Sequence, residues 1–543
     1  MHKYVASLLI GIFSLVSMAA NATHNRAGEI TYRYLGTFTY EITVLTYTYT
    51  PSHANRDSLY IDWGDGSPLQ TVYLDTKVLL PDDMRRNTYV GIHTYPGPGT
   101  YTISMEDPNR NGGVVNIPNS IDVPFYIESV LVINPFMGPN NSPQLLSPPV
   151  DMACFQQPFY HNPVAYDIDG DSLSFSLIPC KGEMGNPIMN YTYPPADSIL
   201  TIDPYTGELT WDSPVSNGEF NIAILIEEYR NGIKIGSIIR DMQIDVLACN
   251  NNPPNISPLK DTCVIAGDTI SFNVSATDPD NQQIIITAIG GPFQVTTSPA
   301  TFQTSNTPPG FATGTFQWIT DCSHIKRSPY YVSFKAQDND IPVSLFDLES
   351  VYIRVISPAP EAVVVHPAGN SIIVSWDKLR CINASGYSIY RRIGPYPFTP
   401  GPCETGLPYY AGYTKIGTVN SVHDTVFVDD NNGNGLVHGL NYCYRIVANF
   451  PDGAQSIVSE EACVELIRDV PIITNISIRN THITQGSSYV AWSKPEIIDT
   501  VAAPGPYRYL MYRTVNNSAT YSLIDSTNNL TDTTFIDTLQ NSV

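Results

Sequence analysis

Alternating strand segments that end in glycine–aspartate turns are the feature that most restricts how this chain can fold. Residues 41–50 read Glu-Ile-Thr-Val-Leu-Thr-Tyr-Thr-Tyr-Thr, a two-residue period rich in β-branched and aromatic side chains. This period predicts a β-strand, because successive side chains of a strand point to opposite faces. The turn Trp63-Gly64-Asp65-Gly66-Ser67 and the segment 93–103 predict further strands of the same small sandwich.

Comparable strand signals recur in four downstream segments. A single hydrophobic core rarely grows beyond about 300 residues, and this chain has 543. We therefore predict an all-β protein, a tandem array of immunoglobulin-like β-sandwich domains joined by linkers rich in proline and asparagine. The predicted domains cover residues 23–135, 136–250, 251–357, 358–468 and 469–543. The last would lack its final two strands before Val543, so we expect the native chain to continue.

The N-terminus predicts export from the cell. A basic start precedes an apolar run at residues 5–16, and Ala20 and Ala22 supply small residues for cleavage. This is the pattern of a secretory signal peptide covering residues 1–22. The apolar run is shorter than the roughly 20 residues that a membrane-spanning helix needs. We therefore expect a secreted or cell-surface protein with no transmembrane helix.

Nine cysteines in an exported chain predict disulfide bonds. Cys443 and Cys463 flank the turn at residues 451–453, so two strands that fold back there would bring them face to face. Two more pairs are predicted within single domains: Cys263 with Cys322, and Cys381 with Cys403. Cys154, Cys180 and Cys249 remain, and any one of the three can be the cysteine without a partner in this chain.

Three aspartates at alternate positions are the best candidate for a metal site. Calcium takes about six to eight oxygen ligands, and a D-x-D-x-D turn delivers several of them to one centre. The candidate ligands are Asp167, Asp169 and Asp171, with weaker pairs at Asp278 and Asp280 and at Asp338 and Asp340. Calcium is thus the candidate cofactor. The alternative is that these are solvated turn residues, whose carboxylates accept hydrogen bonds from their own backbone.

Charge and motifs argue against two large classes of function. A net charge of −23 repels phosphate backbones, so we predict no nucleic-acid partner. The chain has no H-E-x-x-H, G-x-S-x-G or Walker motif. Glu227 and Glu228 are adjacent, so on a strand they would point to opposite faces and could not act as a catalytic pair. We predict a protein that is not an enzyme and has no catalytic residue.

Individual segments resemble known domain types. The turn at residues 63–67, followed by 93–103, resembles the PKD domain. The segments 165–177 and 202–211 resemble cadherin-like sandwiches, and 276–281 repeats the acidic turn of the first of them. The segments 373–376, 386–392 and 442–448 resemble strands B, C and F of fibronectin type III, and the last predicted domain begins the same series again.

The order of these motifs resembles gliding-motility-associated surface proteins. The carrying segments are 24–33, 63–67, 167–173, 240–244 and 439–446. The resemblance implies a gliding-type bacterium and export by type IX secretion, through a C-terminal sorting domain that this chain does not contain.

These observations predict a non-enzymatic structural or adhesion protein that displays a binding surface on a disulfide-stiffened rod. Its partner would be an extracellular polysaccharide or a surface protein. The alternative is an accessory or carbohydrate-binding arm of a larger secreted hydrolase, with the catalytic domain beyond Val543. Tyrosines exposed on one sheet face would favour carbohydrate binding, although tyrosine is common in strands for other reasons.

Overall fold

The computed structural model describes residues 25–51, 56–81, 83–108, 110–305, 307–341, 343–467, 470–496, 498, 505–514 and 520–540. The predicted signal peptide, residues 1–22, lies outside the described residues. Regular structure in the described part is β-strand apart from a few short 3-10 turns. The prediction of an all-β, tandem immunoglobulin-like protein is thus confirmed. The chain divides into two compact units, Met1–Val355 and Ile356–Val543.

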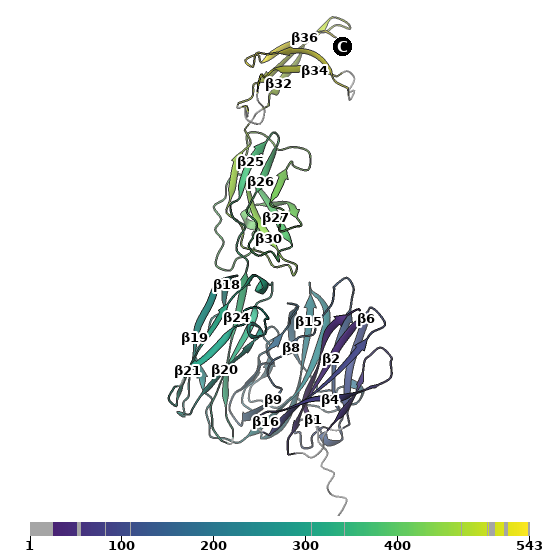
Figure 1. Ribbon diagram of the computed structural model, residues 1–543, viewed down its shortest axis with the longest axis vertical. Coiled ribbons are helices and arrows are strands. Elements are labelled where there is room, and N and C mark those ends of the chain that lie inside the picture. The colour runs from purple at the N-terminus through teal and green to yellow at the C-terminus, as the bar shows by residue number, and fades with distance from the viewer. Residues whose placement is uncertain are drawn as a thin grey trace, which may run out of the picture. The chain divides into compact units, whose positions relative to one another are not determined.

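The first unit contains a large sheet whose strand order closes on itself, because β1 pairs with both β2 and β16. Several of its strands are labelled in Figure 1. Its first seven strands are β1 (Asn25–Gly36), β2 (Thr39–Tyr49), β3 (Ser58–Asp62), β4 (Gln70–Leu79), β5 (Met84–Thr94), β6 (Gly99–Asp107) and β7 (Phe125–Ile133). They are paired in the order β1-β2-β5-β4-β3-β6-β7. Strand β16 (Ile233–Leu247) comes next to β7 and also pairs with β1. Alternate side chains point inward to a core that includes Trp63 and Tyr40.

Strand β16 belongs to the second predicted domain, yet it completes the sheet of the first. It also pairs with β15 (Gly218–Arg230) and β9 (Val150–Cys154), and β12 (Ser172–Ile178) extends the sheet beyond β15. The smaller strands of this region are β8 (Gln144–Leu145), β10 (Phe159–His161), β11 (Ala165–Tyr166), β13 (Leu200–Ile202) and β14 (Leu209–Trp211). The domain boundaries stay predictions, but the strands on either side of residue 135 are not independent sheets.

Two buried ion pairs lie on β16. The Arg240 guanidinium donates to Glu29 Oε2 at 2.6 Å, and neither side chain is more than 1% exposed. Arg110 donates to both carboxylate oxygens of Asp241, at 3.0 and 2.5 Å, and is equally buried. The pair of Arg110 and Asp241 is bidentate, and such charge-assisted bonds fix geometry as well as charge. Each pair therefore ties β16 to residues from before position 135.

A two-sheet sandwich completes the first unit. One sheet contains β17 (Asn255–Ile256), β19 (Thr269–Thr277), β22 (Phe311–Ile319) and β21 (Thr301–Ser305); the other contains β18 (Thr262–Ile265), β24 (Phe346–Ile356), β23 (Tyr330–Gln337) and β20 (Ile285–Gly290). This sandwich packs against the earlier strands, because the side chain of Phe346 belongs to their core. The ring centroids of Phe346 and Phe159 are 6.0 Å apart. The disulfide between Cys154 and Cys249 joins β9 to the residues after β16, and Val343 and Leu345 from the loop before β24 pack in the same small cluster.

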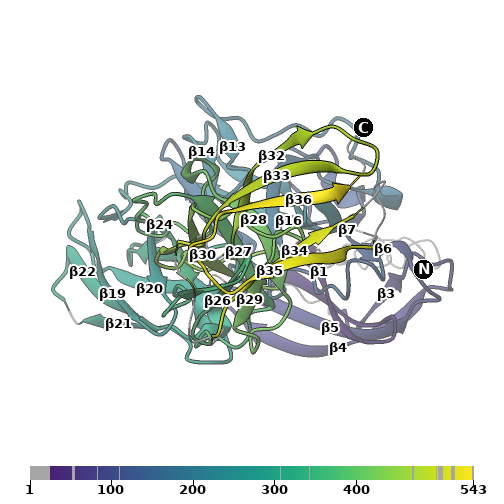
Figure 2. The same cartoon turned by 90° about the horizontal axis from the view of Figure 1, so that it is seen from above.

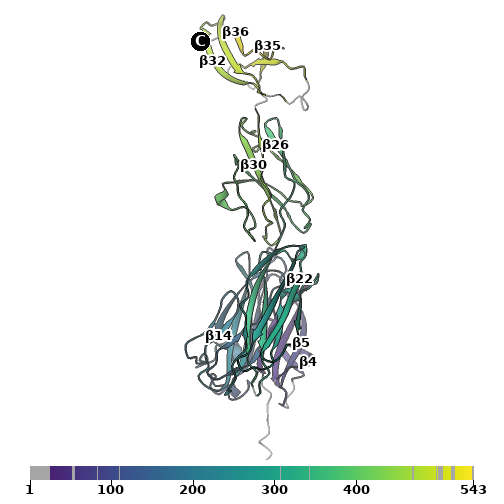
Figure 3. The same ribbon diagram turned by 90° about the vertical axis from the view of Figure 1, so that its left-hand side faces the viewer.

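The second unit begins with a sandwich of three and four strands (Figure 3). One sheet is β25 (Val364–Ala368), β26 (Ser371–Ser375) and β29 (Val426–Asp429); the other is β28 (Thr414–Val419), β27 (Gly386–Ile393), β30 (Asn441–Asn449) and β31 (Ala462–Glu465). Strands β26, β27 and β30 cover the segments assigned from sequence to strands B, C and F. The fibronectin type III class itself stays a prediction.

The last segment forms two smaller sheets, which Figure 2 shows from above. One contains β32 (Ile472–Asn480), β33 (Gly486–Ser493) and β36 (Thr534–Gln540), and the other contains β34 (Tyr509–Arg513) and β35 (Ser522–Thr527). The buried rings of Trp492 and Tyr509 pack together with their centroids 5.4 Å apart, so the two sheets share one small core.

The structure shows which cysteines are in disulfide bonds and which one is free. Cys443 and Cys463 are opposite each other on β30 and β31 and are bonded, as their spacing about the turn predicts. Of the three cysteines left open, Cys154 and Cys249 are bonded and Cys180 is a buried free thiol. The other four, Cys263, Cys322, Cys381 and Cys403, are also in disulfides. Their assignment as 263–322 and 381–403 stays a prediction.

Hydrogen bonds and a ring stack fix the turn at residues 63–67 against the first sheet. The buried Trp63 ring stacks on His93 with centroids 4.8 Å apart, and His93 Nε2 lies 2.7 Å from Asp65 Oδ2. The backbone N–H and hydroxyl of Ser67 both donate to Asp65 Oδ1. Gly64 has a φ of +77°, and a Cβ there would lie 2.4 Å from the Thr102 carbonyl oxygen, so only glycine fits.

Burial by itself would raise the pKa of Asp65, but the hydrogen bonds from Ser67 and His93 outweigh it and lower the pKa to about 2. The folded state therefore favours the ionised carboxylate relative to the unfolded chain, whose aspartates titrate near about 3.9. We expect Asp65→Asn to destabilise the first unit by about 1 to 2 kcal/mol at pH 7, after allowance for solvent screening.

This stabilisation is present above about pH 4 and is lost as the pH falls towards 2, because the wild-type carboxylate then becomes protonated. Thermal unfolding of both proteins at pH 7 and near pH 2 measures it, with Asp75→Asn, an exposed aspartate on β4, as the control. A melting-temperature difference that is the same at both pH values would contradict the assignment.

Candidate functional site

Two clusters of acidic and amide side chains lie where linkers meet sheet ends in the first unit. The first node comprises Asn140, Asn141, Asp167, Asp169, Asp171, Glu228 and Arg230. The second node comprises Asn251, Asn252, Asp278, Asp280, Gln282, Asp338 and Asp340. Together they contain every metal ligand predicted from the sequence.

In the first node, the aspartate turn is held by backbone and linker hydrogen bonds. The N–H of Asp171 donates to Asp167 Oδ1 at 2.8 Å. The backbone N–H and side-chain amide of Asn141 donate to the Asp169 carboxylate, at 2.8 and 3.0 Å. Asn140 Nδ2 donates to Glu228 Oε2 at 2.7 Å. Each linker asparagine thus fixes one acid.

Arg230 supplies the first node with its own positive charge. Its guanidinium donates to both oxygens of Asp171, at 2.8 and 2.5 Å, and to Asn140 Oδ1 at 2.9 Å. It also donates to the carbonyls of Met137 and Pro139, and lies 3.5 Å from Asp169. The first node therefore sets four carboxyl groups against one guanidinium, so its local charge is incompletely balanced.

Asp167 and Glu228 carry the unbalanced part of this charge. Asp167 is 5% exposed and Glu228 is fully buried. Asp167 Oδ2 and Glu228 Oε1 accept no hydrogen bond from any other group, and the two carboxyl groups interact with each other by a side-chain hydrogen bond. An oxygen from each lies within 4.8 Å of the other and of Asp171. Burial, and then the facing carboxyl group, raises the pKa of Glu228, and burial raises the pKa of Asp167. Such a pair needs a proton or a cation between its members.

The second node repeats the hydrogen bonds of the first. The N–H of Gln282 donates to Asp278 Oδ1, four residues apart as in Asp171 and Asp167. The backbone N–H and the side-chain amide of Asn252 both donate to the Asp280 carboxylate. These two residues are 28 positions apart in the chain, as are Asn141 and Asp169 in the first node. The structure therefore contains one polar arrangement twice.

The second node also places its linker amide on a buried acid. Asn251 Nδ2 donates to Asp338 Oδ2 at 2.8 Å, as Asn140 does to Glu228. Burial raises the pKa of Asp338, and Asp278 raises it further. Asp278 Oδ2 is buried and has no partner.

The two nodes differ at two equivalent positions. Gln282 stands where the first node has Asp171. In the first node Arg230 follows Glu228 by two residues. The residue at the same offset from Asp338 in the second node is Asp340. The second node thus has no guanidinium of its own at this position. Its acids are also spread more widely, because no three of its carboxylates meet the 4.8 Å separation that the first node satisfies.

The structure adds Glu228 to the carboxylates predicted from the sequence, and it adds Arg230 and the asparagines as donors of hydrogen bonds to these acids. Glu227 and Glu228 point to opposite faces, as expected from a strand, since Glu227 pairs with Lys234 on the solvent side while Glu228 is buried. The sequence signal for Glu228 is its place at the end of a long apolar strand. Nothing local to residue 228 indicates that the chain brings it to Asp167.

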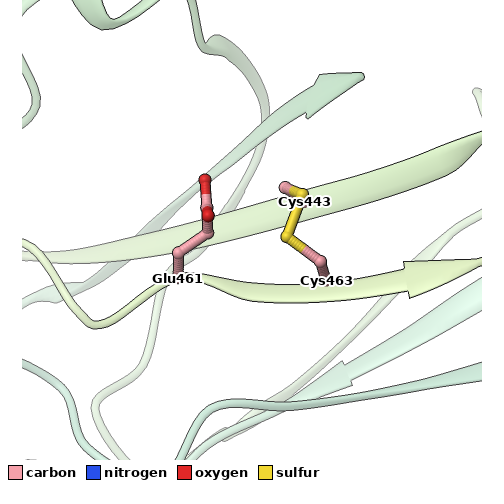
Figure 4. A group of neighbouring side chains, drawn as sticks. All are labelled: Cys443, Glu461 and Cys463. Carbon is pink, nitrogen blue, oxygen red and sulfur yellow. A yellow bond between two sulfur atoms is a disulfide. The ribbon is translucent and has the colours of Figure 1, made fainter. Parts of the chain in front are cut away.

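A second cluster of possible ligands, Cys443, Glu461 and Cys463, is not a metal centre (Figure 4). The two sulfur atoms are bonded to each other, so neither is a thiolate able to bind an ion. Glu461 accepts hydrogen bonds from the Tyr413 hydroxyl and, at 2.9 Å, from the Tyr396 backbone. Both of these bonds occupy Glu461 Oε1.

No protein-family model and no curated protein matches this chain. Among solved structures, titin domains A168-A170 align with 58% of this chain and 94% of their own, at 12% identity and a TM-score of 0.20. Cadherin-like domains 1 to 4 of zebrafish RET align with 81% and 96%, at 9% identity and a TM-score of 0.15. At these TM-scores the likeness carries no argument about function. Within the described residues, no helix is long and apolar enough to span a membrane.

We expect Arg230→Gln to destabilise the first unit by about 3 kcal/mol, because it leaves the 5% exposed Asp171 carboxylate without its partner. The matched control is Arg33→Gln, which removes an exposed pair with Glu41 and should cost less than about 1 kcal/mol. Amide hydrogen exchange of β15 and β12 measures the local opening free energy. Equal losses in the two variants would show that Arg230 is an ordinary surface arginine.

Proposed function

We propose that this protein is a non-enzymatic extracellular structural or adhesion protein, whose sandwiches hold a binding surface in a fixed geometry. The observation that carries this proposal is the cross-linking of the first unit. One disulfide, two fully buried ion pairs and a shared core join strands from residues 25–355. Eight of nine cysteines are in disulfides, which persist chiefly in oxidising compartments outside the cytosol.

The finer parts of the proposal come from the sequence. The segment 1–22 directs the chain out of the cell, and the motif order supports a cell-surface or released protein of a gliding-type bacterium. Export would use type IX secretion, and the partner would be an extracellular polysaccharide or a surface protein. The residues behind this resemblance have structural roles: Glu29 and Arg240 form one buried pair, and Arg26 pairs with Glu219 and Asp245.

We also propose that calcium binds the first node, through Asp167, Asp171 and Glu228. Three carboxylates within 4.8 Å of one another support this, together with one buried oxygen each on Asp167 and Glu228 that no other group of the protein reaches with a donor. Oxygen ligands of this kind suit calcium. Asp169 would lie at the edge of this calcium site, where its carboxylate already accepts a hydrogen bond from Asn141. The second node, with Asp278, Asp280, Asp338 and Asp340, would bind calcium more weakly, because its acids are further apart.

If calcium binds the first node, saturating calcium should raise the melting temperature of EDTA-treated protein by about 5 °C, since a ligand at about 100 times its Kd contributes about 2.7 kcal/mol. Glu228→Gln should abolish most of this shift. Glu227→Gln is the matched control, because the neighbouring side chain faces solvent and should leave the shift intact. An unchanged melt in excess calcium would contradict calcium binding, and so would equal losses in both variants.

Adhesion under flow tests the proposed function. Beads coated with the oxidised full chain should attach to surfaces coated with extracellular polysaccharide or surface protein, and beads coated with reduced, heat-unfolded chain should not. The folded geometry would be the reason, because the binding surface is assembled from several strands. Attachment that is equal for folded and unfolded chains, or absent from every surface, would contradict the proposal. Release of reducing sugar from the polysaccharide by this chain would contradict the proposal that it is not an enzyme.

A further inference from the structure

A tyrosine-lined cleft with a volume of about 440 Å³ opens in the first unit. One wall comes from β11, β12 and the loop between β13 and β14. The other comes from the loop before β23, together with β23 and β24. Its five tyrosines are Tyr166, Tyr205, Tyr330, Tyr331 and Tyr352. The cleft lies beside the first node, because Asp167 and Asp171 contribute to the same wall.

Four of the rings are held in place by the protein. Lys326 Nζ lies over Tyr330 at 4.0 Å and over Tyr166 at 5.4 Å from the ring centroids. The ring of Tyr331 packs edge-on against the ring of Tyr352, with centroids 5.3 Å apart. Asn162 Nδ2 donates to the hydroxyl oxygen of Tyr331 at 2.7 Å. The aromatic walls are therefore formed before any ligand arrives, which reduces the entropy cost of binding.

Gly291 allows two of these rings to lie close to the backbone. A Cβ at this position would meet the Tyr166 ring at 2.7 Å and the Tyr330 ring at 3.2 Å. A side chain there would displace both rings. The glycine thus contributes to the shape of the wall.

Tyr205 is the exposed ring of the cleft, with 83% of its surface open to solvent. Its backbone is nevertheless fixed, because Asp203 Oδ1 accepts the N–H groups of Tyr205 and Thr206 at 2.8 and 2.7 Å. Asn162 also donates to the Thr206 carbonyl at 3.0 Å. An aromatic face presented to solvent on a fixed loop is suited to stacking on a ligand.

We propose that this cleft binds a neutral oligosaccharide. The proposal rests on the binding role proposed above and names its ligand class. Sugar rings present C–H faces that pack on tyrosine, and hydroxyl groups that donate to carboxylates such as Asp203. Asp171 of the lining is already paired with Arg230, whereas Asp203 presents its carboxylate to the cleft. This carboxylate repels uronate and sulfated sugars, so the cleft favours neutral ones.

A proline-rich peptide is the other ligand that aromatic grooves commonly bind. Such a peptide offers mainly carbonyl acceptors and few N–H donors, because proline lacks the N–H group. The Asp203 carboxylate in the lining would therefore gain little from it. The hydroxyl groups of a sugar can both donate to this carboxylate and accept from the tyrosine, serine and threonine hydroxyls that also line the cleft.

The test applies the full chain to an array of neutral glucan, mannan, galactan, xylan and chitin oligosaccharides, with uronate and sulfated oligosaccharides and a proline-rich peptide alongside. Hits are quantified by calorimetry. We expect at least one neutral oligosaccharide to bind, and Tyr205→Ala to weaken that binding about tenfold through the lost ring contact. Tyr205→Phe should retain binding, because stacking uses the ring and not the hydroxyl.

Tyr409→Ala is the matched control, since Tyr409 is a 94% exposed tyrosine of the second unit. The cleft proposal is overturned if no neutral oligosaccharide binds, if Tyr205→Ala and Tyr409→Ala behave alike, or if only acidic sugars or the peptide bind. The bead assay separates this failure from that of the proposed function. Attachment as strong in Tyr205→Ala as in wild type would reject the cleft and leave adhesion standing, whereas absent attachment for wild type would reject adhesion itself.

Discussion

Strand β16 carries two guanidinium–carboxylate pairs that are wholly removed from water, and the arrangement of the first unit depends on them. Desolvating such charges is costly, and the cost is recovered only when the partners are held in good geometry. Arg240 with Glu29 and Arg110 with Asp241 are at 2.6 and 2.5 Å, and the carbonyls of Ser147 and Lys181 accept one further bond from each guanidinium. The pairing of β16 with β1, β7, β9 and β15 supplies the rigid frame. A misplaced β16 would leave four buried charges without partners, which makes the observed register strongly preferred.

The frame positions two copies of one polar arrangement. In each node, linker asparagines bind an aspartate of the acidic turn and an acid at the end of a later strand. The linkers are thereby tied to sheet ends through hydrogen bonds, and the chain direction at each joint is fixed. The copies have diverged in charge, since Arg230 partly neutralises the first node and Asp340 takes the equivalent place in the second. The tyrosine cleft adjoins the first node, so the same hydrogen bonds that fix the linker also support one wall of the cleft.

Local patterns predicted much of the fold. Alternation placed the strands, and the turn at residues 451–453 placed Cys443 opposite Cys463, because both depend on residues close in sequence. The strand geometry also predicted correctly that Glu227 and Glu228 face opposite ways. The role of β16 could not be predicted in this way. It is buried along most of its length, so its sequence does not distinguish a strand of the second sandwich from one shared with the first. Glu228 and Arg230 were missed as node residues because their partners lie about 60 to 90 positions away.

The central claim is that residues on both sides of position 135 form one cooperative body through β16. Amide hydrogen exchange of the wild-type chain and of Glu29→Gln, followed by mass spectrometry, tests it most directly. The account predicts that the variant loses protection together in β1, β7, β15 and β16, because one buried partner holds all four strands in register. A loss confined to residues 25–133, with β15 and β16 unchanged, would contradict it.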